Sequence, residues 1–290
     1  MNSLDSISGD ISILIDKALK EKKGKSKTEI IPGMESFIDK PAPNIIEWAT
    51  RPEYLNLAIE DEDSGKIRTV YDHYGQYQTL RDFFELLCPI CATKDDVLCW
   101  GKSRESLESQ NLLVWDQQYK DDVCPRCKTT RQELNEDGLF KGYELMLLIV
   151  GMRSSKSTTS GIISSFIEHK LLTYVDIAKL FGLIPNQALE ISFVATTAGQ
   201  SEKTVFESWK SLRKNSPWLQ SYLKKLKEAE IVRGQYYDDN SKKIHYKHNN
   251  LRFESFTSNS AGVAGSTRIA CFIDELSRFD TTDSKRSAAE

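Results

Sequence analysis

Long hydrophobic runs, a secretion signal and an excess of positive charge are all missing from this chain of 290 residues. The longest strongly apolar run, residues 145–150, is too short to cross a bilayer, and the N-terminus lacks the basic-then-apolar pattern of a secretory signal. These absences predict a protein of the cytoplasm with no membrane contact. Because the net charge is −3, any contact with nucleic acid depends on local basic stretches rather than on the field of the whole protein.

The overall composition indicates a folded protein rather than a fibrous or disordered one. Hydrophobic residues make up 39% of the chain and charged residues 28%, and the mean hydropathy is −0.45. The length allows one large domain or two modest ones with a sizeable buried core. An enzyme is therefore not excluded by size.

Cysteine is scarce, yet four of the six residues form two pairs with the same CxxC spacing: Cys88, Cys91, Cys124 and Cys127. In a chain without a secretion signal the thiols are expected to be reduced, which argues against a disulfide framework. Two CxxC turns supply the closed tetrahedral shell of a structural zinc site. We therefore predict Zn²⁺ bound by these four residues, with a redox pair or unliganded core thiols as the alternatives. Cys99 is expected to pack in the core of the insert.

Changes of pattern along the chain predict its organisation. Apolar periodicity predicts helices over residues 45–57 and 79–87, and the second of these leads directly to the first cysteine pair. The four predicted regions are a flexible N-terminal arm (1–43), a helical segment (44–87), a zinc-binding insert (88–130) and an α/β core (131–290). The basic run within the arm is expected to be solvated, with phosphate contact as the alternative.

Strand patterns and helix patterns alternate in the second half of the chain. Strands are predicted over residues 143–150, 189–196, 251–256 and 269–273, and helices over residues 158–169, 200–213 and 217–229. Continuous apolarity, as in the first of these strands, is typical of strands buried on both faces of a parallel sheet. The alternation predicts a three-layer α/β/α fold with a mainly parallel sheet.

A phosphate-binding loop is predicted over residues 151–157, at the junction of the first strand and the following helix. Lys156 and Ser157 align with the last two residues of the Walker A pattern, whereas Val150 and Ser155 stand where that pattern has glycine. The chemical requirements are kept: N–H groups at a helix N-terminus, a lysine for the β and γ oxygens and a hydroxyl for Mg²⁺. An ordinary serine-capped helix is the alternative for this loop taken alone.

A second motif follows the predicted strand 269–273, which ends in Asp274 and Glu275. This is the form of a Walker B strand with a catalytic glutamate. Asp274 is expected to hold Mg²⁺ together with Ser157, and Glu275 to orient and deprotonate the attacking water. An acidic solvated turn is the alternative for this motif alone, but both motifs in this order predict a P-loop NTPase.

These segments resemble the large terminase subunit of tailed bacteriophages, the ATP-driven motor that packages DNA into a procapsid. Residues 151–157 are similar to the deviant Walker A loop of that family, in which an arginine, here Arg153, lies inside the loop. Residues 192–206 resemble the segment after Walker A, and residues 258–268 resemble the loop before Walker B. Residues 44–55 look like the first helix of these motors, and the resemblance covers about residues 44–280.

The resemblance implies an ATP hydrolase that uses ATP and Mg²⁺. The residues implied to bind nucleotide are Gly151, Met152, Arg153, Ser154, Ser155, Lys156, Ser157, Thr158, Asp274 and Gln78, the last of these reading adenine. Catalysis would fall to Glu275, Lys156 and Arg153, the arginine finger. A surface arginine paired with a carboxylate is the alternative for Arg153. The partners implied are double-stranded DNA, a portal protein, a small terminase subunit and further copies in a ring, in the cytoplasm of the infected bacterial host. The given sequence has no counterpart of the family's nuclease domain, so nuclease activity is not expected of it.

Two rival functions stay open. One is a helicase-like nucleic-acid-dependent ATPase, and the other is a non-catalytic zinc-binding or nucleotide-binding module. Retention of both Lys156 and Glu275 argues against the non-catalytic module.

Several further residues have two interpretations. Arg268 is a candidate phosphate sensor, with a structural ion pair as the more favoured interpretation. The basic segment 210–227 is predicted to be a solvated helical face with its aromatic residues in the core, and contact with DNA phosphates is the alternative. His245 and His248 are predicted to be solvated loop residues rather than metal ligands.

Overall fold

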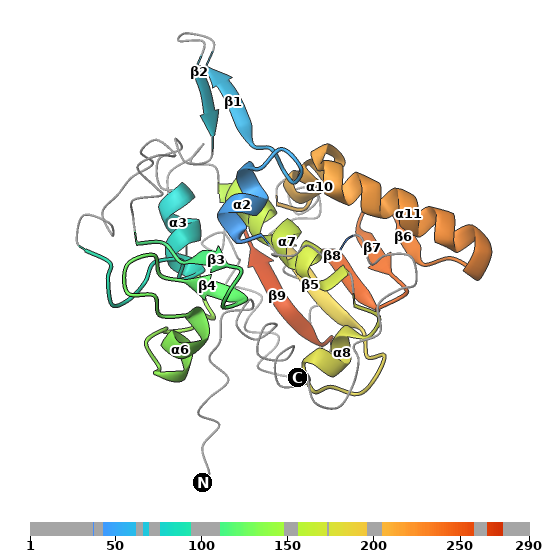
Figure 1. Ribbon diagram of the computed structural model, residues 1–290. Coiled ribbons are helices and arrows are strands. Elements are labelled where there is room, and N and C mark those ends of the chain that lie inside the picture. Colours follow the sequence, from blue (N-terminus) through green and yellow to red (C-terminus); the bar gives the residue numbers. More distant parts are fainter. Residues whose placement is uncertain are drawn as a thin grey trace, which may run out of the picture. The chain divides into compact units, whose positions relative to one another are not determined.

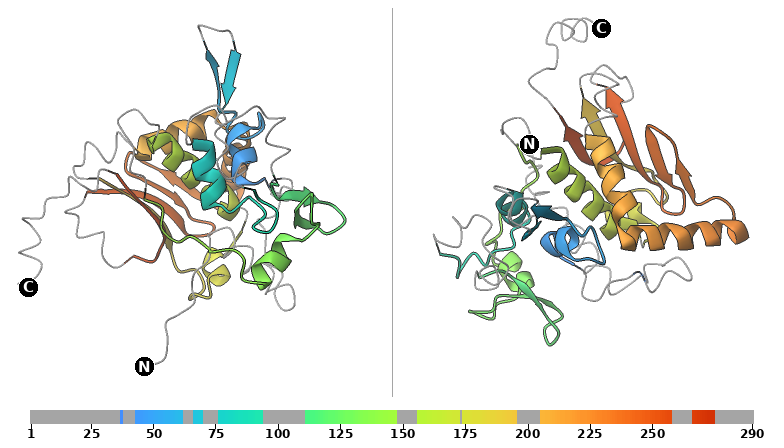
Figure 2. Two further views of the ribbon diagram at one scale, coloured as in Figure 1. Left: turned by 90° about the vertical axis from the view of Figure 1, so that its left-hand side faces the viewer. Right: turned by 90° about the horizontal axis from the view of Figure 1, so that it is seen from above.

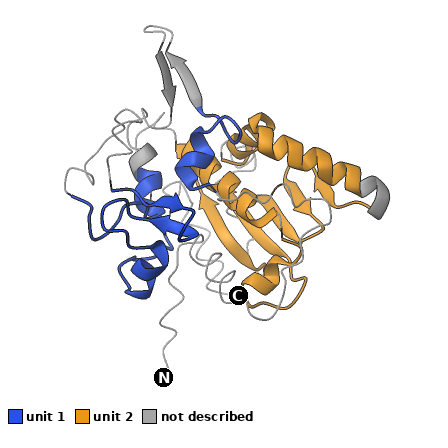
Figure 3. Cartoon of the chain, viewed as in Figure 1, with its two compact units in different colours: residues 1–17, 39–154 blue, residues 18–38, 155–290 orange. Residues whose placement is uncertain are grey.

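The computed structural model describes a large part of the chain, namely residues 37, 43–61, 66–69, 76–93, 111–147, 156–172, 174–195, 205–257 and 266–274. Contacts divide the chain into two compact units (Figure 3). Unit 1 consists of residues 1–17 and 39–154, and unit 2 of residues 18–38 and 155–290. Among the described residues, no helix combines the length and apolarity needed to cross a membrane.

Unit 1 is built from short helices and two small antiparallel hairpins. Its elements are α2 (Ile45–Thr50), β1 (Ala58–Asp61), β2 (Lys66–Thr69), α3 (Gln76–Phe83), β3 (Val114–Asp116), β4 (Asp121–Val123) and α6 (Arg131–Glu136) (Figure 1). The predicted helices 45–57 and 79–87 are therefore present, but the first is much shorter than predicted and the second begins and ends earlier.

The N-terminal helix α2 is short because its sequence specifies both ends. Asn44 caps the helix by accepting hydrogen bonds from the N–H groups of Ile46 and Glu47, and Glu47 accepts a hydrogen bond from the N–H of Asn44 in return. At the other end Arg51 is extended, with ψ of 140°, because a residue before proline avoids the helical conformation and Pro52 follows.

Unit 2 contains the longer helices and the main sheet. Its elements are α7 (Lys156–Leu172), α8 (Ile177–Leu180), β5 (Leu189–Ala195), α10 (Glu207–Asn215), α11 (Pro217–Arg233), β6 (Tyr237–Asp239), β7 (Lys243–Tyr246), β8 (Leu251–Thr257) and β9 (Arg268–Ile273). Strands β5, β8 and β9 confirm three of the four predicted strands to within about one residue.

The sheet of unit 2 is mixed in the described residues, so the prediction of a mainly parallel sheet is confirmed only for the pairing of β8, β5 and β9. Its strand order is β6-β7-β8-β5-β9; β5 is parallel to β8 and β9, whereas β7 is antiparallel to β6 and β8. The antiparallel half of the sheet follows from the length of its connections, because only short turns join β6 to β7 and β7 to β8.

The strand predicted over residues 143–150 is not observed in its described part. Residues 141–147 have no regular secondary structure, and the side chains of Leu145 and Leu147 are 84% and 66% exposed. An apolar run forms a strand only where a neighbouring strand takes up its backbone hydrogen bonds. Within the described ranges no strand pairs with this segment, and residues 148–150 lie outside them.

The three longest helices of unit 2, α7, α10 and α11, lie on the same side of the sheet (Figure 2). The indole of Trp209 on α10 stacks on Phe253 of β8, with ring centroids 4.3 Å apart, and on Phe193 of β5 at 5.4 Å. A closer contact joins α7 to α10, because a Cβ added to Gly161 would meet the Leu212 side chain at 2.9 Å. These contacts form the core that joins α7 and α10 to the sheet.

The opposite face of the sheet carries a row of charged residues. His245, Arg252, Glu190 and Arg268 are register partners on four adjacent strands. The Nε atom of Arg268 donates to the Glu190 carboxylate at 3.0 Å. The described residues thus give long helices on one face only, where the sequence predicts a helical layer on each.

The arm predicted over residues 1–43 contains one described side chain that packs against unit 2. Phe37 lies edge-on to Trp218 and Tyr222 of α11, with ring centroids 5.6 and 5.3 Å apart. Residue 37 therefore has a defined place in unit 2.

Candidate functional site

The predicted phosphate loop leads into helix α7, which begins at Lys156. Ser157 and Thr158 follow in the first turn, all three side chains are half-buried, and this turn contains no acidic residue. The free N–H groups and the partial positive charge of a helix N-terminus favour an anion, and an acidic side chain would compete with it. The start of α7 therefore suits a phosphate group. The other loop residues named above, Gly151, Met152, Arg153, Ser154 and Ser155, lie outside the described residues.

Asp274 lies directly after β9 and is held at the edge of the sheet. Its N–H donates to the carbonyl of Val194 at 3.0 Å, which continues the pairing of β9 with β5. Because β5, β8 and β9 are parallel, their C-terminal ends meet at one edge, where ligands of open α/β sheets bind. The C-terminal end of β9 and the start of α7 lie at this same end of the sheet (Figure 1).

The fold thus brings together, at one end of the sheet, three of the predicted nucleotide-site residues. Lys156 offers an ammonium group, and Ser157 and Asp274 offer the hard oxygen ligands that Mg²⁺ prefers. These groups fit a magnesium-bound polyphosphate. Glu275 lies outside the described residues, and of Gln78 only its helical position in α3 is described.

Arg268 lies at the opposite end of β9 from Asp274, and its contacts confirm the favoured interpretation of a structural ion pair over that of a phosphate sensor. Its Nε donates to Glu190 at 3.0 Å and to the Ser192 hydroxyl at 2.6 Å. A strand rises about 3.3 Å per residue, so about 20 Å of strand separates Arg268 from Asp274. Arg268 has the structural role of an ion pair within the sheet.

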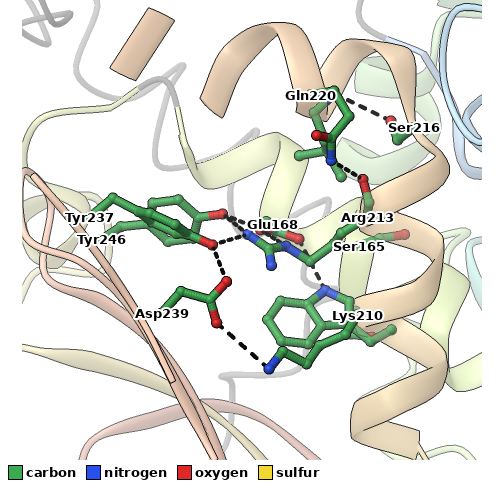
Figure 4. A network of polar contacts seen from close by, with 12 residues as sticks. Ser165, Glu168, Lys210, Arg213, Ser216, Gln220, Tyr237, Asp239 and Tyr246 are labelled. Carbon is green, nitrogen blue, oxygen red and sulfur yellow. Dashed lines mark hydrogen bonds and ion pairs between the residues drawn. The ribbon is translucent and has the colours of Figure 1, made fainter. Parts of the chain in front are cut away.

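In the C-terminal half of α7, a buried network of polar groups around Glu168 joins this helix to α10 and to the sheet (Figure 4). The carboxylate of Glu168 on α7 accepts hydrogen bonds from Arg213 Nε at 2.8 Å, from Trp209 Nε1 at 3.0 Å and from the Tyr246 hydroxyl. Glu168 and Tyr246 are fully buried and Arg213 is 4% exposed. Burial raises the pKa of Glu168 against the opposing effect of Arg213.

The network continues from this buried carboxylate to the surface. Arg213 Nη2 donates to the hydroxyls of Tyr246 and Tyr237 at 2.7 and 2.9 Å, and Tyr237 donates to Asp239 at 3.0 Å. Asp239 is in turn 3.6 Å from the ammonium group of Lys210. Sequence reasoning missed this network; the available signal was Glu168, the one carboxylate in α7.

The aromatic residues of the basic segment 210–227 and its neighbour Trp209 are in the core, as predicted. Trp209 and Tyr222 are fully buried and Trp218 is 8% exposed, so these rings are not available for stacking on bases. The lysines of α11 described in this segment, Lys224, Lys225 and Lys227, are exposed. The α11 part of the segment therefore matches a solvated helical face packed on an aromatic core, whereas Arg213 of α10 is buried in an ion pair with Glu168.

His248 is not the solvated residue that the sequence predicts. Its Nε2 lies 3.1 Å from the carbonyl oxygen of Leu172 and 3.4 Å from the Tyr222 hydroxyl. Burial lowers the pKa of His248 to about 4, so the imidazole is neutral at pH 7. His245 is half-buried on β7 and accompanies Arg252 on the charged face.

The four predicted metal ligands come together in unit 1. The sulfur atoms of Cys88, Cys91, Cys124 and Cys127 all lie within 4.8 Å of one another, and those of Cys88 and Cys127 are 3.8 Å apart. Each pair is held in a tight turn, because Ala92 N–H donates to the Cys88 carbonyl and Lys128 N–H to the Cys124 carbonyl. Cys99 lies outside the described residues.

This geometry fits a tetrahedral metal site. A Zn–S distance of about 2.3 Å in a regular tetrahedron corresponds to sulfur atoms about 3.8 Å apart, the separation found for Cys88 and Cys127. The exposed cations Arg126 and Lys128 lie beside the second pair, where they offset the negative charge that four thiolates leave after binding a divalent ion. The cluster is therefore suited to a thiophilic divalent metal.

The comparisons with known proteins identify one family. Residues 107–288, well over half of the chain, match the family described as "Uncharacterized protein MJ0330, N-terminal P-loop domain". The match spans the predicted phosphate loop, Asp274 and the second cysteine pair. No curated protein and no solved structure matches the chain. The chain therefore contains a P-loop NTPase domain and belongs to the family of the MJ0330 N-terminal P-loop domain.

Proposed function

We propose that this domain hydrolyses ATP and that it is the ATPase part of a viral motor that packages double-stranded DNA into a procapsid. The proposal of ATP hydrolysis is supported by the position of Asp274, which follows β9 directly and lies at the same end of the sheet as the start of α7. A magnesium ligand and a phosphate-binding lysine are needed at this edge in a P-loop enzyme. Packaging is supported by the resemblance of residues 44–280 to the large terminase subunit.

Each residue of the proposed site has a defined task. Lys156 contacts the β and γ oxygens of ATP, while Ser157 and Asp274 hold Mg²⁺, which neutralises charge on those oxygens. Glu275 orients and deprotonates the attacking water, which is the general base role. Arg153 stabilises the charge that develops on the γ-phosphoryl group.

The remaining proposed contacts are with the rest of the nucleotide. The backbone N–H groups of residues 151–155 and of Thr158 surround the phosphates, as in other loops before a helix N-terminus. Gln78 reads the adenine edge. Double-stranded DNA, a portal protein, a small terminase subunit and further copies in a ring are the proposed partners, in the cytoplasm of an infected bacterium.

We propose that the four-cysteine cluster binds Zn²⁺. Zinc prefers the closed four-sulfur shell that two CxxC turns provide, and such sites stabilise small lobes rather than react. The support is the convergence of all four sulfur atoms within 4.8 Å.

The test is ATP hydrolysis in the presence of double-stranded DNA. The parent should hydrolyse ATP, Glu275→Gln should bind ATP but hydrolyse it at least about 100-fold more slowly, and Arg153→Ala should be about 1000-fold slower. Lys170→Ala is the matched control, since it removes the same charge from the other end of α7, and it should hydrolyse ATP at the parent rate.

The rival functions predict different results in the same preparation. Displacement of a third strand from a blunt duplex, without opening of a forked duplex, supports a packaging motor. Opening of the fork supports the helicase-like enzyme instead. A zinc-loaded, folded protein that binds no nucleotide would contradict both and leave the non-catalytic module.

A further inference from the structure

Residues 140–142 are attached to the cysteine-containing part of unit 1 by specific polar contacts. The two carboxylate oxygens of Glu85 accept hydrogen bonds from the N–H groups of Lys141 and Gly142, at 2.7 and 3.1 Å. Gly142 has φ of +62°, so the chain turns sharply at this point. Nine residues further along the sequence, the predicted phosphate loop begins at Gly151.

Glu85 is itself held by Arg131, the first residue of α6. Arg131 Nη2 donates to the carbonyl oxygens of Phe84 and Glu85, at 3.0 and 2.8 Å. Helix α6 starts at its cap Thr130, three residues after Cys127, and the Cys124 N–H donates to the Thr129 carbonyl at 3.0 Å, which joins the second cysteine pair to the start of this helix. Arg131 also lies over the ring of Phe140, with its guanidinium carbon 4.9 Å from the ring centroid.

The core under these contacts is very small and consists largely of the cysteines. Its buried members are Cys88, Leu113, Cys124 and Leu134, with Cys91 and Phe140 packed against them. So few apolar side chains cannot offset the conformational entropy of ordering the surrounding turns, and small lobes of this kind need a metal or another cross-link. Phe140, which packs on this core, directly precedes the anchored residues Lys141 and Gly142.

We propose that zinc in the four-cysteine cluster acts as a clamp for the chain that leads into the phosphate loop. The metal fixes the positions of Phe140 and Arg131, Arg131 fixes the turn that carries Glu85, and Glu85 holds the N–H groups of Lys141 and Gly142. Loss of the metal frees this segment and lowers the affinity of the nucleotide site. Only that last effect rests on the proposed nucleotide binding.

Amide hydrogen exchange tests the clamp directly, because the N–H groups of Lys141 and Gly142 are the donors to Glu85. The zinc-loaded protein is compared with protein stripped by a chelator, in peptides that cover residues 139–144. Removal of zinc should accelerate exchange of these two amides at least about tenfold, because hydrogen bonds to a charged acceptor are lost. Strand β8 in unit 2 is the internal reference and should keep its protection.

A second variant separates the clamp from the folding of the lobe. Glu85→Gln leaves all four cysteines in place, so it should retain one zinc ion per chain, yet it should accelerate the same two amides because an amide oxygen is a weaker acceptor than a carboxylate. Equal exchange in the zinc-loaded and stripped parent, or a purified protein that binds no zinc, would overturn the inference. ATP affinity is measured on the same samples and should fall several-fold in both the stripped protein and Glu85→Gln.

The failure of the clamp and the failure of the proposed function give different results. If zinc controls exchange at Lys141 and Gly142 but the zinc-loaded parent binds no ATP, the clamp stands and nucleotide binding is refuted. If ATP binds equally well with and without zinc and the exchange rates do not change, the nucleotide site stands and the clamp is refuted.

Discussion

The buried pair of Glu168 and Arg213 gives the sharpest prediction about stability. Removing the cation by Arg213→Met, which keeps most of the side-chain volume, leaves the Glu168 carboxylate in the core with hydrogen bonds from Trp209 and Tyr246 but no countercharge. Breaking one partner of a buried ion pair costs about 3 to 5 kcal/mol. That is a large share of the roughly 5 to 15 kcal/mol that keeps a typical protein folded.

The same argument predicts that a second substitution restores stability. In Glu168→Gln with Arg213→Met no charge is buried, and the glutamine oxygen still accepts from Trp209 or Tyr246. The double variant should therefore be more stable than Arg213→Met, with a coupling free energy of about 2 kcal/mol or more in the double-mutant cycle. Urea unfolding followed by the fluorescence of tryptophan, including Trp209 within the network, measures all four proteins.

The pH dependence of Arg213→Met provides an independent check. Burial already raises the pKa of Glu168, and loss of Arg213 removes the main opposing interaction. A carboxyl group with a raised folded pKa binds more protons in the folded state, so the free energy of unfolding should fall as the pH rises above about 4.3, the value of an unfolded glutamate. Additive single substitutions, or a flat pH profile for Arg213→Met, would refute the assignment of a charged, coupled pair.

Two further predictions concern the core of unit 2. Gly161→Leu should lower the free energy of unfolding by about 2 to 3 kcal/mol in calorimetry, because even a Cβ at this position meets Leu212 at 2.9 Å; Gly161→Ala, which gains helix propensity, should cost far less. Between pH 6.5 and 4 the free energy of unfolding of the parent should fall by about 3 kcal/mol because of His248, whose folded pKa of about 4 means that mainly the unfolded state takes up the proton. The free energy of unfolding of His248→Gln should fall correspondingly less over the same range. An identical fall in both proteins would argue against this role.

The sequence predicts the strands of unit 2 well where apolarity alone decides burial. Strand β9 follows from its continuous apolar run over residues 269–273, and β5 follows from an apolar pattern that only Glu190 and Ser192 interrupt. The mixed topology is harder to predict, because it depends on the turns before and after β7. Asn250, with φ of +56°, lies in the second of these turns, and turns of this length allow only antiparallel pairing.

The apolar run 143–150 shows the limit of pattern reasoning. Its composition fits a buried strand, but a strand also needs a partner, and the described residues 141–147 have none in the sheets. Conversely, the position of Lys141 beside the cysteine cluster depends on Glu85, which is 56 residues away in the sequence. No local periodicity reports such contacts.

The candidate site is predicted in part for the same reason. The CxxC spacing correctly predicts that four sulfur atoms come together, because a spacer of two residues between two ligands already specifies a tight turn. The Glu168 and Arg213 pair is invisible to spacing, since 45 residues separate its members. The solvated position predicted for His248 is wrong, because polarity in the sequence does not reveal the depth at which a residue is buried, whereas the ion pair favoured for Arg268 is confirmed.

Nucleotide binding at the start of α7 is the central claim, and thermal unfolding with Mg²⁺ and a non-hydrolysable ATP analogue tests it most directly. At about 100 times the dissociation constant the ligand should stabilise the zinc-loaded parent by about 2.7 kcal/mol, which raises the unfolding temperature measurably. The same shift is expected for Lys170→Ala and none for Lys156→Ala. A parent protein that shows no shift, or a Lys156→Ala variant that shows the full shift, would contradict the assignment of Lys156 to a phosphate-binding site.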